Sequence, residues 1–443
     1  MFNAANQKYA IGILGLWHLG SVYSACLAEL GHDVIGYDRD ANTVSLLNSG
    51  EPPVHESGLP ELIKKNMLSG RLAYTNNLDD LKKRNVFWFT IDTEIDRNDM
   101  PDISNIKQMI TDAASYFKKE TALIFSSQLP VGSSAELKAL VSSLRPGLNF
   151  GYAYQPENLQ LGKALENFLK PARIIVGTDA QNMKLIVENI FSPLGAPIET
   201  ISIPSAEMAK HALNAFLATS LSFIYDIADV CEKYGANVLE VTKALKSDSR
   251  IGGAAYLDAS IGFSGGTLGR DLAVLLDKAK AKKIKLPVIF GAVTKNKERW
   301  RLLADFLKGE IKNLSQATIG VLGMTYKPGT STLRHSLSVQ VVRDLAPMVK
   351  EIRCHDPLAN KEEVMATAKC IFYDDPYKMV EGSSALIVMT GCSEYRDLDF
   401  KKMAPIMKEP KIFFDAKNIF WEREQEIRKA GFHYQGIGIS KNL

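Results

Sequence analysis

Short apolar runs separated by stretches of helical periodicity characterise the first part of the chain. Strand-like runs cover Lys8–Leu14, Asp33–Tyr37, Val86–Thr90, Ala122–Ser126 and Ile174–Val176. Helical patterns lie between these runs, and such alternation is typical of a parallel sheet with helices on both faces. The pattern therefore predicts a doubly wound α/β domain over residues 1–204.

A different pattern begins at Ser205. Apolar residues recur at helical spacing through Met208, Ala212 and Phe216 as far as Tyr234, which predicts one long helix. The chain stays mostly helical to about residue 307 and is interrupted by the glycine-rich stretch 262–269. We expect a central helical domain over 205–312, and we expect the apolar face of the long helix to form a homodimer interface.

Strand-like runs return in the last third of the chain. They cover Ala317–Gly323, Glu351–His355, Ala385–Met389 and Lys411–Phe414. We therefore expect a second Rossmann-like domain over 313–443. The predicted fold is α/β, with two doubly wound domains joined by a long central helix and a helical middle domain.

Composition narrows the choice of partners. The 443 residues carry a formal net charge of +3 and are 46% hydrophobic, as in ordinary globular proteins. This charge balance gives no reason to expect nucleic acid or an anionic membrane as a partner, and no apolar run reaches the ~20 residues of a membrane helix. The first residues lack the layout of a secretory signal. The five cysteines show no C-x-x-C spacing, so we expect reduced thiols, no metal site and a cytoplasmic location.

A dinucleotide fingerprint follows the first strand. In a Rossmann turn the first glycine makes the bend, the second admits the pyrophosphate, and the third lets the helix pack on the strand. Gly15 and Gly20 occupy the first and third places, and Trp17 occupies the second. Asp38, at the tip of the second strand, is placed to bind a ribose diol, which favours NAD over NADP. An indole at the second place is expected to obstruct the pyrophosphate unless the ring swings aside. The competing interpretation is a Rossmann domain that keeps its fold but has lost the ligand.

Several segments in this order together resemble the UDP-glucose/GDP-mannose dehydrogenase family. They are residues 48–50, 55–59, 129–132, 155–158, 206–210, 214–219, 250–252, 262–271, 322–328 and 415–418. The family oxidises the sugar 6-hydroxyl of a nucleotide sugar to a carboxylate and consumes two NAD. The resemblance implies a nucleotide sugar as substrate, most simply a UDP-sugar.

The resemblance also assigns site residues. For catalysis it implies Glu157 in handling water and protons, Lys210 in stabilising oxyanion charge, Asn214 in positioning the sugar, and Thr267 and Asp271 in the loop of the nucleophile. For the cofactor it implies Gly15, Trp17, Leu19, Gly20, Asp38 and Arg270. For the substrate it implies Tyr256, Phe263, Gly265, Lys327, Lys417, and Arg250 reaching across a dimer. Four of these residues also have a purely structural interpretation. Lys210 and Asn214 would form a solvated helix face, Asp271 would cap a helix, and Glu157 would lie next to a helix N-cap.

The family's nucleophile is missing. The family loop reads roughly G-F-G-G-S-C-x-P-K-D, and residues 262–271 align with it without a gap, placing Thr267 where the cysteine belongs. A thiolate is nucleophilic near neutral pH, whereas an alkoxide needs a dedicated base. Further departures are Gln128 for a threonine, residues 91–94 for a proline-bearing loop, and Lys417 for an arginine.

Three functions remain open. The first is an NAD-dependent nucleotide-sugar oxidoreductase with altered chemistry, which either stops at the aldehyde after one hydride or oxidises transiently as an epimerase does. The second is a non-catalytic nucleotide-sugar-binding or scaffold protein. The third and least favoured is a full dehydrogenase that uses Thr267 or water as nucleophile.

Overall fold

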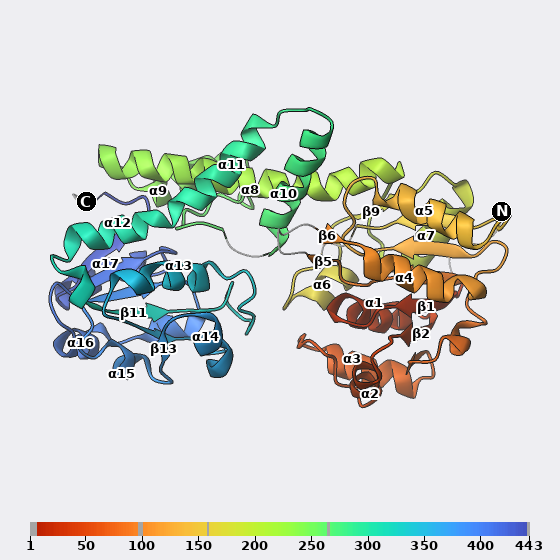
Figure 1. Cartoon of the computed structure of the whole chain (residues 1–443), viewed down its shortest axis with the longest axis horizontal. Helices are drawn as coiled ribbons and strands as arrows, with labels where there is room; N and C mark the ends of the chain where they lie inside the picture. Colours follow the sequence, from red (N-terminus) through yellow and green to blue (C-terminus); the bar gives the residue numbers. More distant parts are fainter. Residues whose placement is uncertain (1–6, 96–100, 157–158, 264–265, 441–443) are drawn as a thin grey trace. The chain divides into compact units, whose positions relative to one another are not determined.

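A computed structural model describes residues 7–95, 101–156, 159–263 and 266–440. Contacts within the chain divide it into two compact units, Met1–Ala212 and Leu213–Leu443. Each unit contains its own sheet (Figure 1). The predicted limits of 1–204, 205–312 and 313–443 stay a prediction.

The first unit is built on a sheet whose strands run in the order β10-β9-β8-β7-β4-β1-β2-β3. These pairings are parallel except for the pair between β8 and β9. The strands are β1 (Ala10–Leu14), β2 (Asp33–Tyr37), β3 (Leu72–Thr75), β4 (Val86–Phe89), β7 (Ala122–Phe125), β8 (Gly151–Tyr154), β9 (Ile174–Gly177) and β10 (Ile198–Ile201); β5 (Glu94–Ile95) and β6 (Pro101–Asp102) form a separate pair. The predicted parallel sheet is confirmed.

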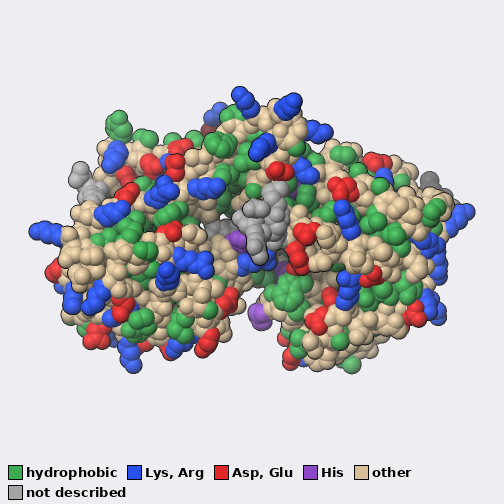
Figure 2. Space-filling model, in the orientation of Figure 1, with side chains coloured by type: hydrophobic (Ala, Val, Ile, Leu, Met, Phe, Trp, Pro, Cys, Tyr) green, Lys and Arg blue, Asp and Glu red, His purple; other side chains and the backbone are tan. Residues whose placement is uncertain are grey.

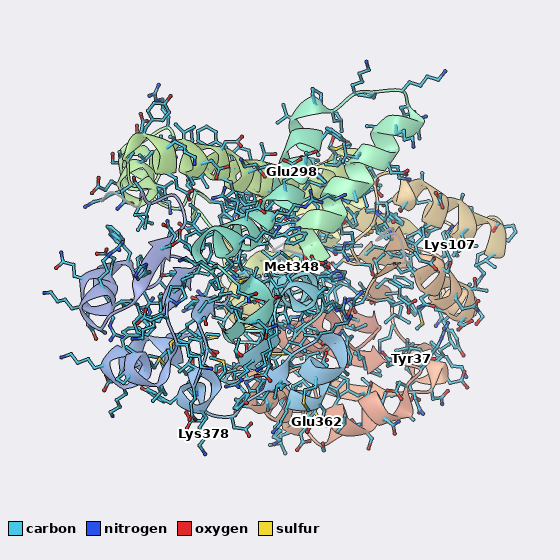
Figure 3. The ribbon with its side chains drawn as sticks, turned by 60° about the vertical axis from the view of Figure 1, so that its left-hand side comes forward. Tyr37, Lys107, Glu298, Met348, Glu362 and Lys378 are labelled. Carbon is cyan, nitrogen blue, oxygen red and sulfur yellow. A yellow bond between two sulfur atoms is a disulfide. The ribbon has the colours of Figure 1, made fainter. Side chains whose placement is uncertain are left out.

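Helices cover both faces of this sheet because successive strand side chains point to opposite sides. Trp88 packs into the core on one face, and its neighbours Phe87 and Phe89 pack into the core on the other. The first core includes residues of α1 (His18–Glu29), α2 (Ala41–Asn48), α3 (Leu59–Leu68), α6 (Ala164–Leu169) and α7 (Gln181–Phe191), and the second includes residues of α4 (Ser104–Ala113) and α5 (Ser133–Leu144). Lys107 of α4, which is labelled in Figure 3, donates to Glu136 of α5 at 2.9 Å on the exposed side of these two helices.

The long helix predicted from Ser205 is α8 (Ile203–Tyr234). The helices that follow are α9 (Val238–Ser247), α10 (Gly266–Ala281), α11 (Pro287–Arg299) and α12 (Arg301–Glu310). The expectation that residues 262–269 interrupt the helical pattern is wrong in part, because α10 already begins at Gly266. Helix propensity is a weak constraint, and tertiary packing overrides two glycines in the first turn.

The second unit contains a parallel sheet in the order β13-β12-β11-β14-β15-β16. Its strands are β11 (Thr318–Leu322), β12 (Glu351–His355), β13 (Ile371–Phe372), β14 (Ala385–Val388), β15 (Ile412–Asp415) and β16 (His433–Gly436). One face packs with α8, α12 and the helices α13 (Leu337–Leu345) and α14 (Lys361–Thr367); the other packs with α15 (Pro376–Val380), α16 (Phe400–Met403) and α17 (Glu424–Lys429). The predicted second Rossmann-like domain is confirmed.

Short 3₁₀ segments complete the two units. They are η1 (Leu78–Leu81), η2 (Ala114–Tyr116), η3 (Ser192–Leu194), η4 (Leu314–Gln316), η5 (Ala346–Met348), η6 (Ser393–Asp397), η7 (Ala404–Ile406) and η8 (Trp421–Arg423).

One cysteine expectation is wrong. Cys354 of β12 and Cys370, next to β13, form a disulfide, whereas Cys26, Cys231 and Cys392 are free and buried. The two bonded residues are 16 positions apart and are brought together by the pairing of β12 with β13, a relation that spacing in the sequence alone does not show.

The surface agrees with the near balance of charge. On the face shown in Figure 2, acidic and basic side chains are interspersed. Within the residues that the structure describes, no helix combines the length and the apolar character needed to cross a bilayer.

Candidate functional site

The turn between β1 and α1 keeps the backbone geometry of a dinucleotide site. Gly15 has a φ of +93°, which favours glycine, and a Cβ there would lie 2.6 Å from the Ile91 side chain. A Cβ on Gly20 would lie 1.8 Å from the Gly15 carbonyl oxygen. The first glycine therefore makes the bend and the third lets the helix approach the strand, as predicted. Leu19, also predicted at the cofactor, is buried in the first turn of α1.

Trp17 is the N-cap residue of α1 and has a φ of −64°. This conformation needs no glycine, so the indole is accommodated without backbone strain. The residue is 51% exposed. The ring therefore does not fill the core but lies at the solvent side of the helix N-terminus, where a Rossmann domain receives pyrophosphate.

Asp38 follows β2, the neighbour of β1 in the sheet. Its Oδ2 accepts from the Leu16 backbone N–H at 2.8 Å, and its Oδ1 accepts from the Asp40 N–H at 3.0 Å. A carboxylate has about four acceptor positions, and Asp38 is only half-buried. It therefore retains capacity for a ribose diol, so the turn residues fit a dinucleotide apart from the bulk of Trp17.

A buried carboxylate that the sequence did not single out supports this turn. Glu56 accepts from the backbone N–H groups of Gly162 at 2.9 Å and Ala164 at 2.7 Å, and its Oε2 lies 3.0 Å from His18 Nε2. It thereby ties the first turn of α1 to the segment before α6. Its partners lie 38, 106 and 108 positions away, so no local pattern predicts the contacts.

Three residues predicted for catalysis lie on α8 and α10. Asn214 of α8 donates through Nδ2 to the Asp271 carboxylate of α10, and Lys210 lies one helical turn before Asn214. All three residues are buried, with exposed fractions of 9% for Lys210, 5% for Asn214 and 2% for Asp271. The interpretation of Lys210 and Asn214 as a solvated face is therefore wrong. Asp271 lies within α10 rather than at its cap.

Thr267 is the second residue of α10 and is exposed. It lies one helical turn before Asp271, so both face the same side of the helix. The Arg270 guanidinium lies near the same carboxylate, with Nε 3.9 Å from Asp271 Oδ1. Glu157 and Gly265, also predicted at this site, lie outside the described residues.

Two predicted substrate residues follow strands of the second sheet. Lys327 comes after β11 and Lys417 comes after β15, and both strands flank β14. The carboxyl ends of parallel strands lie at one edge of a sheet, which is where such folds bind ligands. Phe263 is brought to the same edge, because the adjacent Ile261 donates its N–H to the Ala416 carbonyl at 3.4 Å.

Lys417 has an unusual environment for a cation. Desolvation by burial lowers the pKa of its ammonium group to about 8, although the nearby Asp415 carboxylate raises it. Asp415 accepts from the Lys417 and Phe420 backbone N–H groups at 3.1 and 2.7 Å. Burial raises the pKa of Asp415.

Asp356 occupies in the second sheet the position that Asp38 occupies in the first. Its Oδ2 accepts from Met324 N–H at 2.7 Å, Thr325 N–H at 3.0 Å and the Thr325 hydroxyl at 3.2 Å. Its Oδ1 accepts from Leu358 and Ala359 N–H groups, both at 2.9 Å. The residue is 5% exposed. These bonds occupy its acceptor capacity, so this acid holds the loop after β11 and the turn after β12 rather than a ligand.

The remaining predicted substrate residues are exposed. The side chain of Arg250 is 87% exposed and pairs with Asp248 at 2.7 Å. Tyr256 is 45% exposed. Their contact with a substrate stays a prediction.

Comparison with known proteins identifies the family. The sequence models of the UDP-glucose/GDP-mannose dehydrogenase family match residues 9–195 (NAD binding domain), 204–298 (central domain) and 320–422 (UDP binding domain). The chain belongs to the UDP-glucose/GDP-mannose dehydrogenase family. It is therefore an NAD-binding member of a family of nucleotide-sugar dehydrogenases.

Individual relatives are similar over nearly the whole chain. The UDP-glucose 6-dehydrogenase of Rhizobium meliloti is 31% identical over 97% of this chain and 99% of its own length. The UDP-glucose 6-dehydrogenase TuaD of Bacillus subtilis is 29% identical over 97% of this chain and 93% of its own.

Solved structures share the fold. A UDP-glucose dehydrogenase from Pyrobaculum islandicum superposes with a TM-score of 0.90 at 24% identity, covering 99% of this chain and 100% of that one. The UDP-D-ManNAc dehydrogenase from Pyrococcus horikoshii has a TM-score of 0.86 at 26% identity, covering 97% and 99%.

Proposed function

We propose that this protein is an NAD-dependent oxidoreductase of a UDP-sugar that transfers one hydride per sugar, either to release an aldehyde or to return the hydride in an epimerisation. The observation that supports this most directly is a buried Asn214–Asp271 pair behind an exposed Thr267. Lys210, Asn214 and Asp271, which we propose to handle the sugar, are buried, whereas the residue that aligns with the family's thiol carries a hydroxyl.

Lys210, Asn214 and Asp271 have defined roles in this proposal. A buried ammonium beside the reacting oxygen stabilises negative charge as the sugar hydroxyl loses its proton. The Asn214 amide is oriented by Asp271, and this fixes the amide toward one ligand geometry. Glu157 serves as the proton acceptor by resemblance. NAD, held at the Gly15–Gly20 turn with Asp38 on its ribose, supplies the hydride acceptor.

The second oxidation is the step that Thr267 prevents. In the family a thiolate adds to the aldehyde carbon, and the adduct then loses the second hydride. A threonine hydroxyl ionises far less readily than a thiol and needs an adjacent base to act as a nucleophile at neutral pH. The sugar is therefore expected to stop at the aldehyde level.

A homodimer completes the proposal. Exposed apolar residues recur along α8 at Phe216, Phe223 and Val230, with exposed fractions of 70%, 48% and 54%. Their spacing of seven residues places them along one side of the helix, as in helix–helix seams. Such a stripe is typical of a surface covered by a second copy, and Arg250 is then proposed to reach the partner's substrate.

Stoichiometry tests the function. The protein is incubated with excess NAD and a set of UDP-, GDP- and dTDP-sugars, NADH is counted, and the sugar product is identified. We expect at most one NADH per sugar and an aldehyde or epimer as product. Two NADH per sugar with a uronate product contradict the proposal.

Thr267 variants sharpen this experiment. Thr267→Cys is expected to gain some uronate formation if the surrounding groups are intact, whereas the matched control Thr267→Ser is expected to gain none. Binding of the nucleotide sugar is measured for both variants by calorimetry.

Non-catalytic binding is the second candidate, and Trp17 in the place of the second glycine favours it. In that case the wild type binds a nucleotide sugar but forms neither NADH nor epimer, and Thr267→Cys remains inert.

A further inference from the structure

The loop that leads into α10 is held by two residues of α11, one helical turn apart. Asn296 accepts from the Phe263 backbone N–H through Oδ1 at 2.8 Å and donates through Nδ2 to the Phe263 carbonyl at 3.1 Å. One amide side chain therefore satisfies both backbone polar groups of a predicted substrate residue. Such a two-point contact fixes the position and the orientation of that peptide segment.

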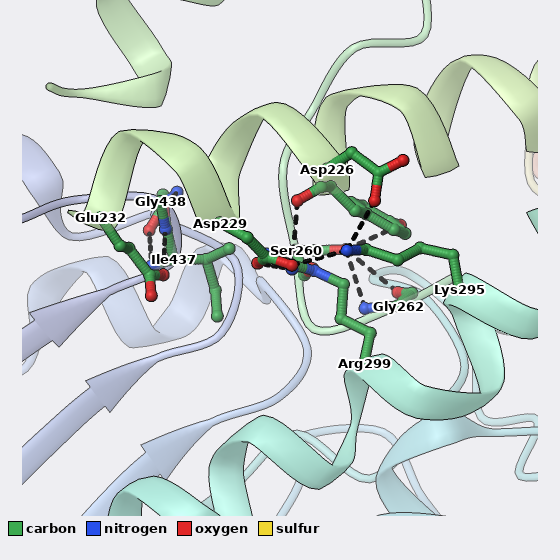
Figure 4. A network of polar contacts seen from close by, with 11 residues as sticks. Asp226, Asp229, Glu232, Ser260, Gly262, Lys295, Arg299, Ile437 and Gly438 are labelled. Carbon is green, nitrogen blue, oxygen red and sulfur yellow. Dashed lines mark hydrogen bonds and ion pairs between the residues drawn. The ribbon is translucent and has the colours of Figure 1, made fainter. Parts of the chain in front are cut away.

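Arg299 contacts the same loop at Ser260, three residues before Phe263 (Figure 4). Its Nε donates to the Ser260 carbonyl at 2.7 Å, and its Nη1 donates to the Tyr225 carbonyl at 3.2 Å. The guanidinium carbon lies 5.0 Å from the centre of the Tyr225 ring. The side chain is fully buried, so these bonds form in a low-dielectric setting where they are strong.

Acidic residues of α8 compensate the buried charge. Arg299 pairs with Asp229, and Lys295 of α11 contacts Asp229 and Asp226, both at 2.6 Å. A buried guanidinium without a carboxylate is costly. The Asp229 contact therefore lets an arginine occupy this place, and Lys295 still neutralises Asp229 if Arg299 is removed.

The loop has little freedom to relax away from these contacts. Gly262 has a φ of +143°, and a Cβ there would lie 3.1 Å from both Asn296 Oδ1 and the Leu337 side chain. The Ser260 hydroxyl donates to the Gly262 carbonyl at 3.0 Å and lies 3.1 Å from the Tyr225 hydroxyl. The backbone of 260–263 is thus specified from several sides at once.

We propose that Asn296 and Arg299 are positioning residues for the sugar end of the substrate, an inference that rests on the proposed function. They set the conformation of the loop 260–263, which carries Phe263 and continues into α10 with Thr267 and Asp271. Lys327 and Lys417 follow strands β11 and β15, whose hydrogen bonds within the sheet hold them. Loss of the clamp therefore weakens binding of a nucleotide sugar more than binding of the nucleotide alone.

Arg299→Met tests the clamp, with Arg301→Met as matched control because Arg301 is exposed. Hydrogen exchange is followed by mass spectrometry in peptides covering 258–263, and dissociation constants for UDP-glucose and UDP are measured by calorimetry on the full-length protein. We expect exchange in the loop to rise about tenfold or more in Arg299→Met only. We expect UDP-glucose binding to weaken about tenfold, with UDP binding changed less than about twofold.

Asn296→Asp is an independent test of the clamp that leaves the side-chain volume nearly unchanged. The carboxylate still accepts from Phe263 N–H but cannot donate to its carbonyl, so the same selective loss is expected. Unchanged loop exchange in both variants, or equal weakening of UDP and UDP-glucose, overturns the inference.

Failure of the proposed function is recognised separately. If the wild type binds neither UDP-glucose nor UDP, the proposed function is wrong together with the substrate half of this inference. In that case the exchange measurement still decides whether the clamp exists.

Discussion

Of the departures that the resemblance implies, Trp17 and Thr267 bear most directly on the cofactor and the chemistry, and they lie in different units. Trp17 occupies the place of a glycine without backbone strain, because its φ is −64°. Thr267, which the resemblance aligns with the family's cysteine, lies at an exposed position of α10. Neither substitution disturbs the fold, so their effects are expected in ligand binding and chemistry rather than in stability.

Replacing Trp17 by glycine tests whether the indole obstructs the dinucleotide. Removal of an exposed ring at the helix N-terminus opens the space that a pyrophosphate occupies, so we expect Trp17→Gly to tighten NAD binding about tenfold. Calorimetric titration with NAD measures this, and Leu46→Gly, at another exposed apolar position of the same unit, is the control. Weaker NAD binding by Trp17→Gly would mean that the ring is part of the site.

Lys417 predicts a pH dependence that the family's arginine would not give. Its pKa of about 8 means that the cation is present below pH 8 and is lost above it. If Lys417 contacts the diphosphate, binding of UDP weakens about tenfold between pH 7 and pH 9. Lys417→Arg is expected to bind UDP equally at both pH values, because a guanidinium stays charged. A wild type whose UDP affinity is flat from pH 7 to pH 9 would exclude this role.

At the scale of elements, α8 presents two different sides. Its buried side carries Lys210 and Asn214, and its exposed side carries the apolar stripe Phe216, Phe223 and Val230. A helix can present both because residues three or four apart share a face while the opposite face remains free.

A charge in the middle of the stripe is expected to separate the proposed dimer. Phe223→Glu loses the burial of an aromatic ring and places a carboxylate in an apolar interface, which costs about 3 kcal/mol or more. Light scattering at micromolar concentration should show a monomer for this variant and a dimer for the wild type. Leu185→Glu on α7, also at a half-exposed apolar site (51%), should leave the dimer intact. A monomeric wild type would remove the dimer from the proposal.

At the scale of the whole molecule, each of the two contact-defined units carries its own hydrophobic cores. The predicted NAD residues other than Arg270 lie in the first unit, and Lys327 and Lys417 lie in the second. Ligands that bind only the native state stabilise the part they bind.

Calorimetric unfolding is therefore expected to show two transitions. NAD at about 100 times its dissociation constant adds about 2.7 kcal/mol to the unit it binds, which raises one transition by about 5 °C or more. UDP should raise the other transition. A single transition that both ligands shift equally would show that the units unfold together.

How much of the structure the sequence predicts depends on how far apart in the chain the interacting residues lie. Apolar strands such as Val86–Phe89 are visible because their side chains are buried on both faces. The edge strand β10 (Ile198–Ile201), mostly half-buried, lacks that signature and was not predicted. The Asn214–Asp271 bond joins residues 57 positions apart, so only the family pattern suggested that both belong to one site.

Arg299 shows most clearly why the remaining features cannot be predicted from the sequence. It lies in the run Lys295-Asn296-Lys297-Glu298-Arg299, which is typical of a solvated helix end. Its burial depends on Asp229, 70 positions earlier, and on a loop folded beneath it. No local pattern carries that information.

The two acids that follow second strands, Asp38 and Asp356, also bear on how this protein can be engineered. Asp38 keeps free acceptor capacity beside its backbone contacts, so cofactor preference can be redesigned there, for example toward NADP by substitution with a small neutral residue and a nearby arginine. Asp356 gives no such opportunity, because its acceptor capacity is taken up by the loop after β11 and by the turn after β12. Asp38 in the first Rossmann-like domain is thus a position at which cofactor specificity can be changed. The corresponding Asp356 in the second domain has a structural role.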